Sequence, residues 1–361
     1  MYKVQVLLST YNGEAYIKEQ LDSILNQEDV SVRILIRDDG STDSTKDILR
    51  AYTALHKNVR CIHGENAGVT ASFFRLFELC DSDIDFYALA DQDDVWDLDK
   101  LKIACSKLEE LRSSYPEVSQ IIPGNDYTQN ASHSGNENQT NTQNNKSRKK
   151  KNKKKNQHKE QPTPVYDVRS FPVPLLYCAD ALNTDENLNP LPDKMQTIGQ
   201  AKIPDFRNAL IENIARGASI VFNKALMSYI RISMPENVYM HDWWLYLVAS
   251  CFGEVYYDSD AHYKYRQHTK NVLGAAAPSG ISKLTRRLRQ SKTNGGHVSK
   301  QAQSFARIYR VPEDKQLYLN IVTKYQDVKK YRKMGMSGEY LFRQDEKDNK
   351  IFKLMFRSNH L

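Results

Sequence analysis

Short apolar runs alternate with amphipathic stretches along the first 112 residues. The apolar runs are typical of buried strands and lie at 4–9, 32–36, 60–62 and 86–90. The stretches between them place apolar residues at helical spacing and lie at 14–27, 43–55, 98–111 and in the segment that opens at Gly68. This alternation predicts a mostly parallel sheet covered by helices on both faces.

The second half of the chain continues the pattern less regularly. Residues 173–180 predict a strand that ends in a carboxylate, and 214–223 a strand interrupted by Gly217. Further on, the sequence predicts a short apolar helix and two late strands, at 241–251, 254–257 and 262–265. Residues 281–361 are expected to be helical and polar.

Between the two halves lies a segment of different composition. Residues 113–164 are rich in Asn, Gln, Ser and Lys and contain almost no large apolar side chain. Such a segment buries too little surface to offset its ordering entropy, so we expect a disordered, dispensable insertion. The predicted organisation is a first half (1–112), this insertion (113–164), a second half (165–280) and a C-terminal region (281–361).

Charge is distributed unevenly over these parts. The chain has a formal net charge of +7; because residues 123–164 contribute +6 and residues 281–361 contribute +12, the remainder carries −11. An acidic body argues against a nucleic-acid-binding core and suits a protein that supplies carboxylates to a metal.

Residues 281–289 combine apolar and basic positions. Ile281, Leu284 and Leu288 share one helical face and have four cations around them. Such a helix either rests on an anionic membrane leaflet or packs on the acidic surface of the body.

Composition also indicates the cellular compartment of the protein. Hydrophobic residues make up 40% of the chain, and no apolar stretch approaches the length of a membrane span. The five cysteines are scattered without paired or metal-binding spacing. We therefore expect a protein of the reducing cytoplasm that carries no signal peptide.

Three carboxylates follow the apolar run 86–90. Asp91, Asp93 and Asp94 would repel one another at a strand end unless a cation is bound there. In an open α/β sheet, this edge is also where ligands bind, so a divalent metal carrying a nucleotide diphosphate fits the pattern. The alternative is a helix N-terminus capped by Asp93 or Asp94, which explains one carboxylate well and three poorly.

Two other strand ends are polar. Residues 9–13 precede a helix, so their backbone N–H groups are placed to face a phosphate or a base, and Asp38 and Asp39 have acceptors for a base or ribose. Each taken alone is explained equally by turn chemistry. Three polar strand ends on one edge favour a nucleotide crevice.

The block 240–244 sets an acidic residue beside two tryptophans. Asp242 in this partly apolar setting is a candidate general base, while the alternative is a helix cap with the tryptophans in the core. Arg266 and His268 follow a predicted strand and add a cation and an imidazole.

Five motifs stand in a recognisable order, at residues 9–13, 37–43, 91–96, 241–244 and 265–268. With them the chain resembles family 2 glycosyltransferases, most of all the rhamnosyltransferase-type members that build bacterial surface polysaccharides. The resemblance covers about residues 2–112 and 172–275. It implies the α/β GT-A fold: a single mostly parallel central sheet flanked by helices, with a Rossmann-like nucleotide-binding half, an acceptor half and a helical C-terminal tail.

The resemblance also implies roles for particular residues. Donor contacts would come from Thr10, Tyr11, Asn12 and Glu14 at the base and ribose, Asp39 at the base edge and Asp91 at the ribose or metal. Asp93 and His268 would bind Mg²⁺ or Mn²⁺, and Asp242 would take the acceptor proton. Candidate acceptor contacts are Asp94, Arg216, Trp243, Trp244 and Arg266.

The function implied is inverting transfer of a sugar, with L-rhamnose from dTDP-L-rhamnose as the first candidate, to a lipid-linked polysaccharide at the cytoplasmic membrane. A sugar nucleotidyltransferase is an alternative, but it would carry a Gly-rich, Arg-containing loop where this chain has Ser9-Thr10-Tyr11-Asn12-Gly13-Glu14. An inactive scaffold tethered by its lysine run is a third interpretation, against which the carboxylates at Asp93 and Asp242 argue.

Overall fold

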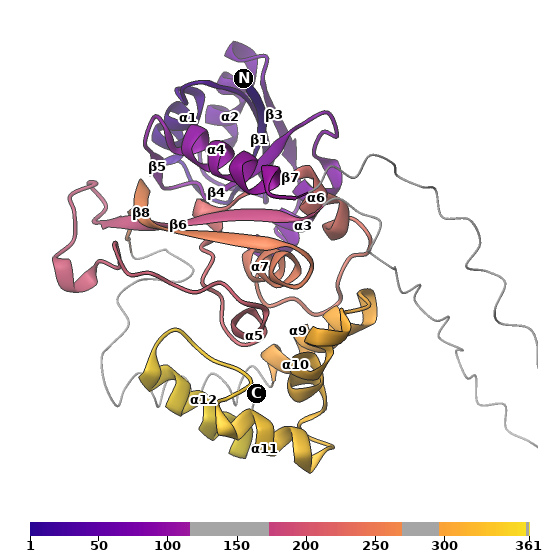
Figure 1. Ribbon diagram of the computed structural model, residues 1–361. Helices are drawn as coiled ribbons and strands as arrows, with labels where there is room; N and C mark the ends of the chain where they lie inside the picture. Colours follow the sequence, from indigo (N-terminus) through magenta and orange to yellow (C-terminus); the bar gives the residue numbers. More distant parts are fainter. Residues whose placement is uncertain (116–172, 269–295, 359–360) are drawn as a thin grey trace, which may run out of the picture.

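The computed structural model describes residues 1–115, 173–268, 296–358 and 361. In these ranges, one eight-stranded sheet runs through the molecule (Figure 1). Its strands are β1 (Tyr2–Thr10), β2 (Val30–Asp38), β3 (Val59–His63), β4 (Phe86–Ala90), β5 (Val95–Trp96), β6 (Leu175–Thr184), β7 (Val221–Asn223) and β8 (Glu254–Arg266). The strand order is β3-β2-β1-β4-β7-β6-β8-β5.

Most neighbouring strands run parallel. β1 pairs in parallel with β2 and β4, β2 with β3, and β6 with β8, whereas β7 runs antiparallel to β4 and β6 and β5 antiparallel to β8. The mostly parallel sheet predicted from the sequence is confirmed, with two short antiparallel strands added. Because β1, β2, β4, β6 and β8 share one direction, their carboxyl ends meet at one edge.

Helices cover both faces of the sheet. They are α1 (Ile17–Leu25), α2 (Thr45–Leu55), α3 (Val69–Leu79), α4 (Lys100–Ser113), α5 (Phe206–Ala209), α6 (Lys224–Ile230), α7 (His241–Phe252), α9 (His297–Ile308), α10 (Glu313–Lys324), α11 (Lys329–Ser337) and α12 (Glu346–Ser358). Apolar side chains of α1, α2 and α4 fill one core, and those of α3, α5, α6, α7 and the C-terminal helices fill the other. We call these the α1 face and the α7 face.

Two predicted strands differ from those observed. The segment 214–223 forms a strand only at its end, because Gly217–Ser219 makes a 3₁₀ turn and the Gly217 N–H bonds to Asp242. The two late strands are one, β8, since its central residues remain in the sheet through register shifts against β6. The short elements β5, α5 and α6 were not predicted.

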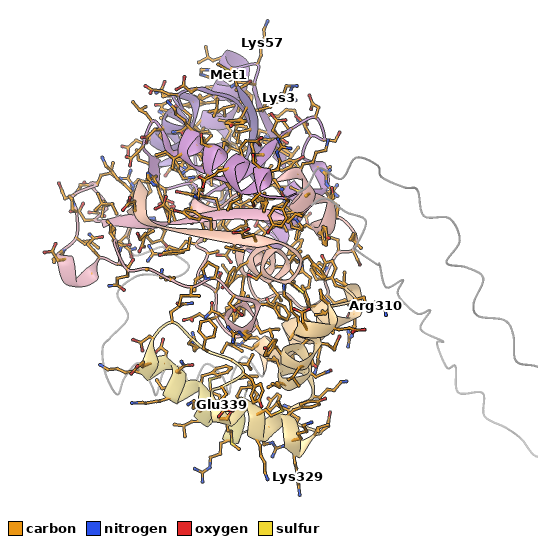
Figure 2. The ribbon with its side chains drawn as sticks, viewed as in Figure 1. Met1, Lys3, Lys57, Arg310, Lys329 and Glu339 are labelled. Carbon is orange, nitrogen blue, oxygen red and sulfur yellow. The ribbon has the colours of Figure 1, made fainter. Side chains whose placement is uncertain are left out.

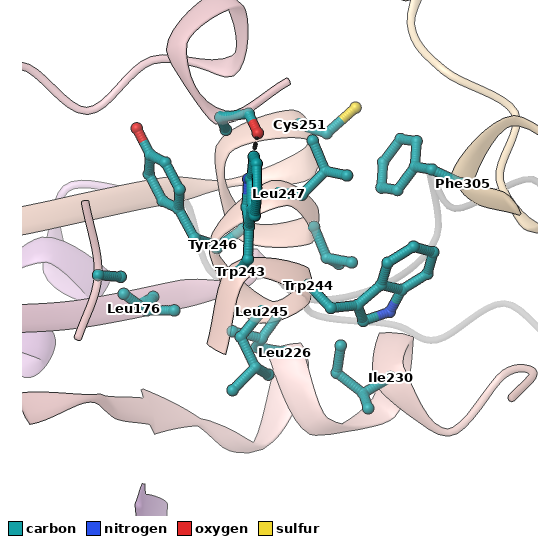
Figure 3. Packing of buried hydrophobic residues seen from close by; sticks show 14 of the residues in the cluster. Leu176, Leu226, Ile230, Trp243, Trp244, Leu245, Tyr246, Leu247, Cys251 and Phe305 are labelled. Atoms are coloured by element: carbon teal, nitrogen blue, oxygen red, sulfur yellow. Dashed lines mark hydrogen bonds between the residues drawn. The ribbon is translucent and has the colours of Figure 1, made fainter. Parts of the chain in front are cut away.

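The C-terminal region is helical as predicted, but each described helix contributes apolar side chains to a core. Phe305 of α9 is buried and packs edge-on against Trp244 of α7, with 5.7 Å between ring centroids. Tyr309 follows, 6.2 Å from the same indole, and Figure 3 shows this packing around Trp244 and Phe305. The described tail therefore packs on the body. The segment 281–289 and nearly all of the 113–164 insertion lie outside the described residues.

This packing predicts a stability effect at Phe305. Truncation by Phe305→Ala leaves a cavity against Trp244 and should lower the free energy of unfolding by about 3–5 kcal/mol. Urea denaturation measures the change, with Leu354→Ala on the exposed side of α12 as the control. A loss below about 1 kcal/mol would show that α9 is not held by this core.

Candidate active site

The predicted metal ligands come together at the carboxyl edge of the sheet. Asp93, in the loop after β4, and His268, just after β8, lie 175 positions apart in the chain, and Asp93 Oδ2 is 2.7 Å from His268 Nε2. The Tyr16 ring lies 5.0 Å from the His268 ring and restricts its orientation. The strand directions bring this pair together, because β4 and β8 end at the same edge.

Asp91 and Asp242 approach this pair from β4 and from the start of α7. Burial, followed by the negative charges of Asp93 and Asp242, raises the pKa of Asp91 to about 7. Burial likewise raises the pKa of Asp242, which is 8% exposed, to about 6. The two carboxylates are thus close enough to influence each other's ionisation.

The Asp242 carboxylate is held by two backbone N–H groups. Trp243 N donates to Oδ1 at 2.7 Å, and Gly217 N donates to Oδ2 at 3.2 Å. The neighbouring His241 stacks on Phe73 with 3.8 Å between centroids, and burial lowers its pKa to about 3. His241 is therefore neutral at physiological pH and supplies no positive charge to Asp242.

Three of the candidate acceptor contacts lie in the interior. Trp243 and Trp244 are 7% and 0% exposed, and Trp243 Nε1 donates to the Ala209 carbonyl at 2.7 Å. Asp94 is fully buried, and its Oδ1 accepts the Arg266 backbone N–H at 3.2 Å. The tryptophans thus belong to the core of the α7 face, and Asp94 ties the β4 loop to β8.

Arg266 also connects elements of the fold. It is 3% exposed and forms an ion pair with Glu19 of α1, and its Nε donates to the Asp93 carbonyl at 2.8 Å. A further guanidinium N–H bonds to the Glu186 carbonyl, and the Tyr16 ring lies 4.5 Å from Cζ. Arg266 thereby fixes the backbone that carries Asp93.

A buried lysine lies behind the loop after β4. Lys100, at the start of α4, is 1% exposed, and its Nζ lies 3.6 Å from the centre of the Trp96 ring. Burial lowers the pKa of Lys100 to about 7, and the negative charge of Asp94 opposes that shift. A basic side chain thus lies in the interior behind the carboxylates, while the Asp93 side chain at the edge of the sheet contacts His268.

The loop after β1 is held by a residue that sequence reasoning did not single out. Gln92 Oε1 accepts the Thr10 hydroxyl at 2.7 Å and the Tyr11 N–H at 2.8 Å, and its Nε2 donates to the Tyr11 carbonyl. A Cβ at Gly13 would lie 2.6 Å from Gln92 Oε1, so a larger residue at this position would displace the Gln92 side chain. The position of Gln92 between Asp91 and Asp93 was the available signal.

The remaining donor candidates of this loop bond to the turn before α2. Asn12 has a φ of 50°, and its Oδ1 accepts the Thr42 N–H at 2.8 Å. Glu14 Oε2 accepts the Ser44 N–H at 2.9 Å. These bonds join the ends of β1 and β2 into one rigid rim, from which the Tyr11 side chain is exposed.

The carboxylate oxygens of Asp39 accept most of their hydrogen bonds from within the protein. It forms a buried ion pair with Arg37, and it accepts the backbone N–H groups of Ala67 and Gly68, each at 2.9 Å. Oδ2 has one protein donor and retains a free lone pair for a base.

The donor set at the edge is mixed. Asp93 offers a carboxylate, the ligand type that suits Mg²⁺ and Mn²⁺, whereas His268 offers an imidazole, which is more usual at transition metals than at Mg²⁺. Among the described residues, no group of three or more His, Cys, Asp or Glu side chains is placed to hold a metal. A protein contribution of two ligands leaves coordination positions for diphosphate oxygens and water.

The fold is that of a GT-A glycosyltransferase domain. Residues 5–171, a little under half of the chain, match the sequence model of glycosyl transferase family 2. Across 99% of its length, the chain is similar in fold to the structure of S. aureus TarS residues 1–349 in complex with UDP-GlcNAc. That match covers 92% of the TarS chain, with a TM-score of 0.51 and 14% identity.

Curated relatives match over shorter stretches. The dTDP-rhamnosyl transferase RfbG of Shigella flexneri is 39% identical over 101 residues, which are 27% of this chain and 35% of the relative. The putative teichuronic acid biosynthesis glycosyltransferase TuaG of Bacillus subtilis is 32% identical over 100 residues, 27% of this chain and 39% of the relative. The chain thus matches little more than a third of the length of either relative.

Burial of Asp242 predicts a pH-dependent stability effect. Its carboxyl binds a proton more readily in the folded state, so stability declines as pH rises from about 4 to above 6. Asp242→Asn removes this decline and should raise the free energy of unfolding at pH 8 relative to pH 4.5 by about 2 kcal/mol.

Urea denaturation of the wild type and the variant at both pH values checks this effect. Asp47→Asn on exposed α2 provides the matched control. An Asn variant whose stability relative to the wild type is the same at both pH values would contradict the burial argument.

Proposed function

We propose that the protein is an inverting glycosyltransferase that moves a sugar from a nucleotide donor to a saccharide acceptor. The observation that carries this proposal is the convergence of Asp91, Asp93, Asp242 and His268 at one edge of the sheet. The family of residues 5–171 supports sugar transfer over nucleotidyl transfer or an inactive scaffold.

For the donor we propose dTDP-L-rhamnose. The support is the match to a dTDP-rhamnosyl transferase at 39% identity over 101 residues. Thr10, Tyr11, Asn12 and Glu14, together with Asp39, would line the base and ribose. Gln92 would act indirectly, by holding the loop that carries Thr10 and Tyr11.

In the proposed mechanism, Asp242 takes the proton of the acceptor hydroxyl while that oxygen attacks the anomeric carbon. A pKa of about 6 leaves Asp242 ionised at neutral pH and close enough to the pH to accept a proton efficiently. The N–H groups of Trp243 and Gly217 orient the carboxylate. Attack opposite the leaving group inverts the anomeric centre through an oxocarbenium-like transition state.

Mg²⁺ or Mn²⁺ is the proposed cofactor, with Asp93 and His268 as its ligands. When bound, it would neutralise charge on the departing nucleoside diphosphate. Arg266 holds the Asp93 backbone and so keeps the carboxylate toward His268.

The proposed acceptor is a lipid-linked polysaccharide, met at the inner face of the cytoplasmic membrane. None of the helices in the described ranges has the length and apolarity to cross a bilayer. The proposed attachment is peripheral and relies on the basic C-terminal region. In the described part of this region, Lys329 lies at the surface (Figure 2). Each cation near an anionic leaflet contributes about 1 kcal/mol.

The proposal is tested with a panel of nucleotide sugars, by following release of the nucleoside diphosphate from purified protein with Mn²⁺. We expect release from dTDP-L-rhamnose above that from UDP- and GDP-sugars. No release from any donor, with or without a glycan acceptor, would contradict transferase function.

Asp93→Ala removes one of the two proposed metal ligands. The variant should lose the Mn²⁺-dependent part of its affinity for a nucleoside diphosphate, as measured by calorimetry with and without Mn²⁺. Asp97→Ala, an exposed carboxylate a few residues away, is the matched control. Unchanged Mn²⁺-dependent binding in Asp93→Ala would exclude the assignment.

Asp242→Asn keeps the shape of the proposed base and removes its basicity. Transfer should fall by roughly 10²–10⁴-fold while donor affinity is retained. Initial rates and calorimetry on the same preparation separate these effects. Near-normal transfer would rule out the role, and a parallel loss of donor affinity would indicate a binding role instead.

Membrane attachment is tested without deleting the tail, because α9 packs on the core and its removal would expose Trp244. Replacing Arg286, Arg287 and Arg289 by Gln should abolish salt-sensitive sedimentation with anionic liposomes. Replacing Lys329, Lys330 and Lys333 in α11 is the charge-matched comparison. Equal binding to neutral vesicles, or unchanged binding by the arginine variant, would contradict the proposed attachment.

A further inference from the structure

A group of polar side chains lies near the ends of β6 and β8 and includes the residue just before Gly217, which bonds to the proposed base. Arg216 directly precedes Gly217, whose N–H bonds to Asp242. Its guanidinium lies 3.9 Å from Asp180 near the end of β6. Lys202 lies nearby, where its Nζ donates to the Tyr257 hydroxyl at 2.6 Å and its charge acts on Arg216 and Asp180. We call Arg216, Lys202 and Asp180 the Arg216 cluster.

The guanidinium of Arg216 has spare hydrogen-bonding capacity. Its contacts to Asn183 Oδ1 and Thr197 Oγ1 measure 3.3 and 3.4 Å, and the nearest Asp180 oxygen is farther away. Charge-assisted bonds are usually about 2.7–2.9 Å long. The side chain is 34% exposed, and Cζ lies 5.6 Å from the Tyr265 ring, which helps to orient it.

Spare hydrogen-bonding capacity is not shared by Arg266, the other arginine of the site. Arg266 is buried, pairs with Glu19 and bonds to two carbonyls, so its donors are used within the protein. Arg266 is paired with α1, whereas Arg216 directly precedes Gly217, which bonds to Asp242.

Asp180 does not neutralise the cluster. Its Oδ1 already accepts the Thr197 hydroxyl at 2.5 Å and the Ala181 N–H at 3.1 Å, and its charge is shared between Arg216 and Lys202, of which Lys202 is also acted on by Glu212. The register between β6 and β8 shifts on both sides of Asp180. Such irregularities redirect side chains and are frequent beside functional sites.

We propose that the Arg216 cluster binds an anionic group, a carboxylate or a phosphate, on the saccharide acceptor. The planar fork of a guanidinium matches both anions. Because Arg216 directly precedes the residue whose N–H holds Asp242, we assign the anion to the acceptor and not to the donor diphosphate. This inference rests on the proposed function, because it takes Asp242 to mark the acceptor side.

The test measures the binding of simple sugars to the full chain, with the donor site filled by nucleoside diphosphate and Mn²⁺. Ligand-observed NMR titrations compare methyl β-D-glucuronide, glucose 1-phosphate and the neutral methyl β-D-glucoside. At least one charged sugar should bind about tenfold more tightly than the neutral one, as one additional charge-assisted bond predicts. The two charged probes distinguish a carboxylate from a phosphate.

Arg216→Gln should reduce this preference to below about threefold, and Arg216→Lys should keep part of it, because the charge remains but the fork is lost. Arg310→Gln, on the surface of the C-terminal helices (Figure 2), should leave the preference unchanged. Equal affinity for neutral and charged sugars, no saturable binding of either anion, or full preference in Arg216→Gln would overturn the inference.

The binding assay and the donor assay fail separately. A protein that binds the anions through Arg216 but releases no nucleoside diphosphate from any donor would contradict the proposed transfer and keep the anion site. Donor turnover without an Arg216-dependent preference for charged sugars would support the proposed transfer and contradict the anion site.

Discussion

Crowding of carboxylates at one edge of the sheet is the constraint on which the rest of the site depends. Asp91, Asp94 and Asp242 all have raised pKa values, in each case first because they are buried. Keeping such groups together opposes folding, so surrounding elements must hold them. Arg266 and His268 do this from β8, because their chain direction brings them to the same edge as β4.

Local pattern and strand direction determine most of the fold, and both can be inferred from the sequence. Apolar runs and helical spacing identified most elements, and the resemblance to a known family paired Asp93 with His268, which lie 2.7 Å apart. The sequence was insufficient where tertiary contacts override local preference. Gly217 leaves the predicted strand because Asp242 takes its N–H. The burial of Asp94 and Arg266 depends on contacts with elements distant in sequence.

The sequence did not reveal that the C-terminal helices support α7, because the first of them is polar overall. Residues 297–308 are polar overall, yet Phe305 faces Trp244, one turn from the start of α7. Since Asp242 is the second residue of α7, the position of the proposed base depends on helices encoded more than fifty residues later. A helix that carries a reactive carboxylate must be fixed along its whole length, and the C-terminal helices supply that fixation.

The two halves of the site also differ in how completely their polar groups are used. On the proposed donor side, Gln92, Asp39 and Arg266 are bonded within the protein, which makes that side rigid. On the proposed acceptor side, Arg216 retains donors and exposure. A rigid donor side suits a ligand common to a whole family, and the family match ends at residue 171, before either Arg216 or Asp242. Unused donors on the other side are what an acceptor particular to this chain would require, because a saturated surface has no hydrogen bonds left to select one saccharide over another.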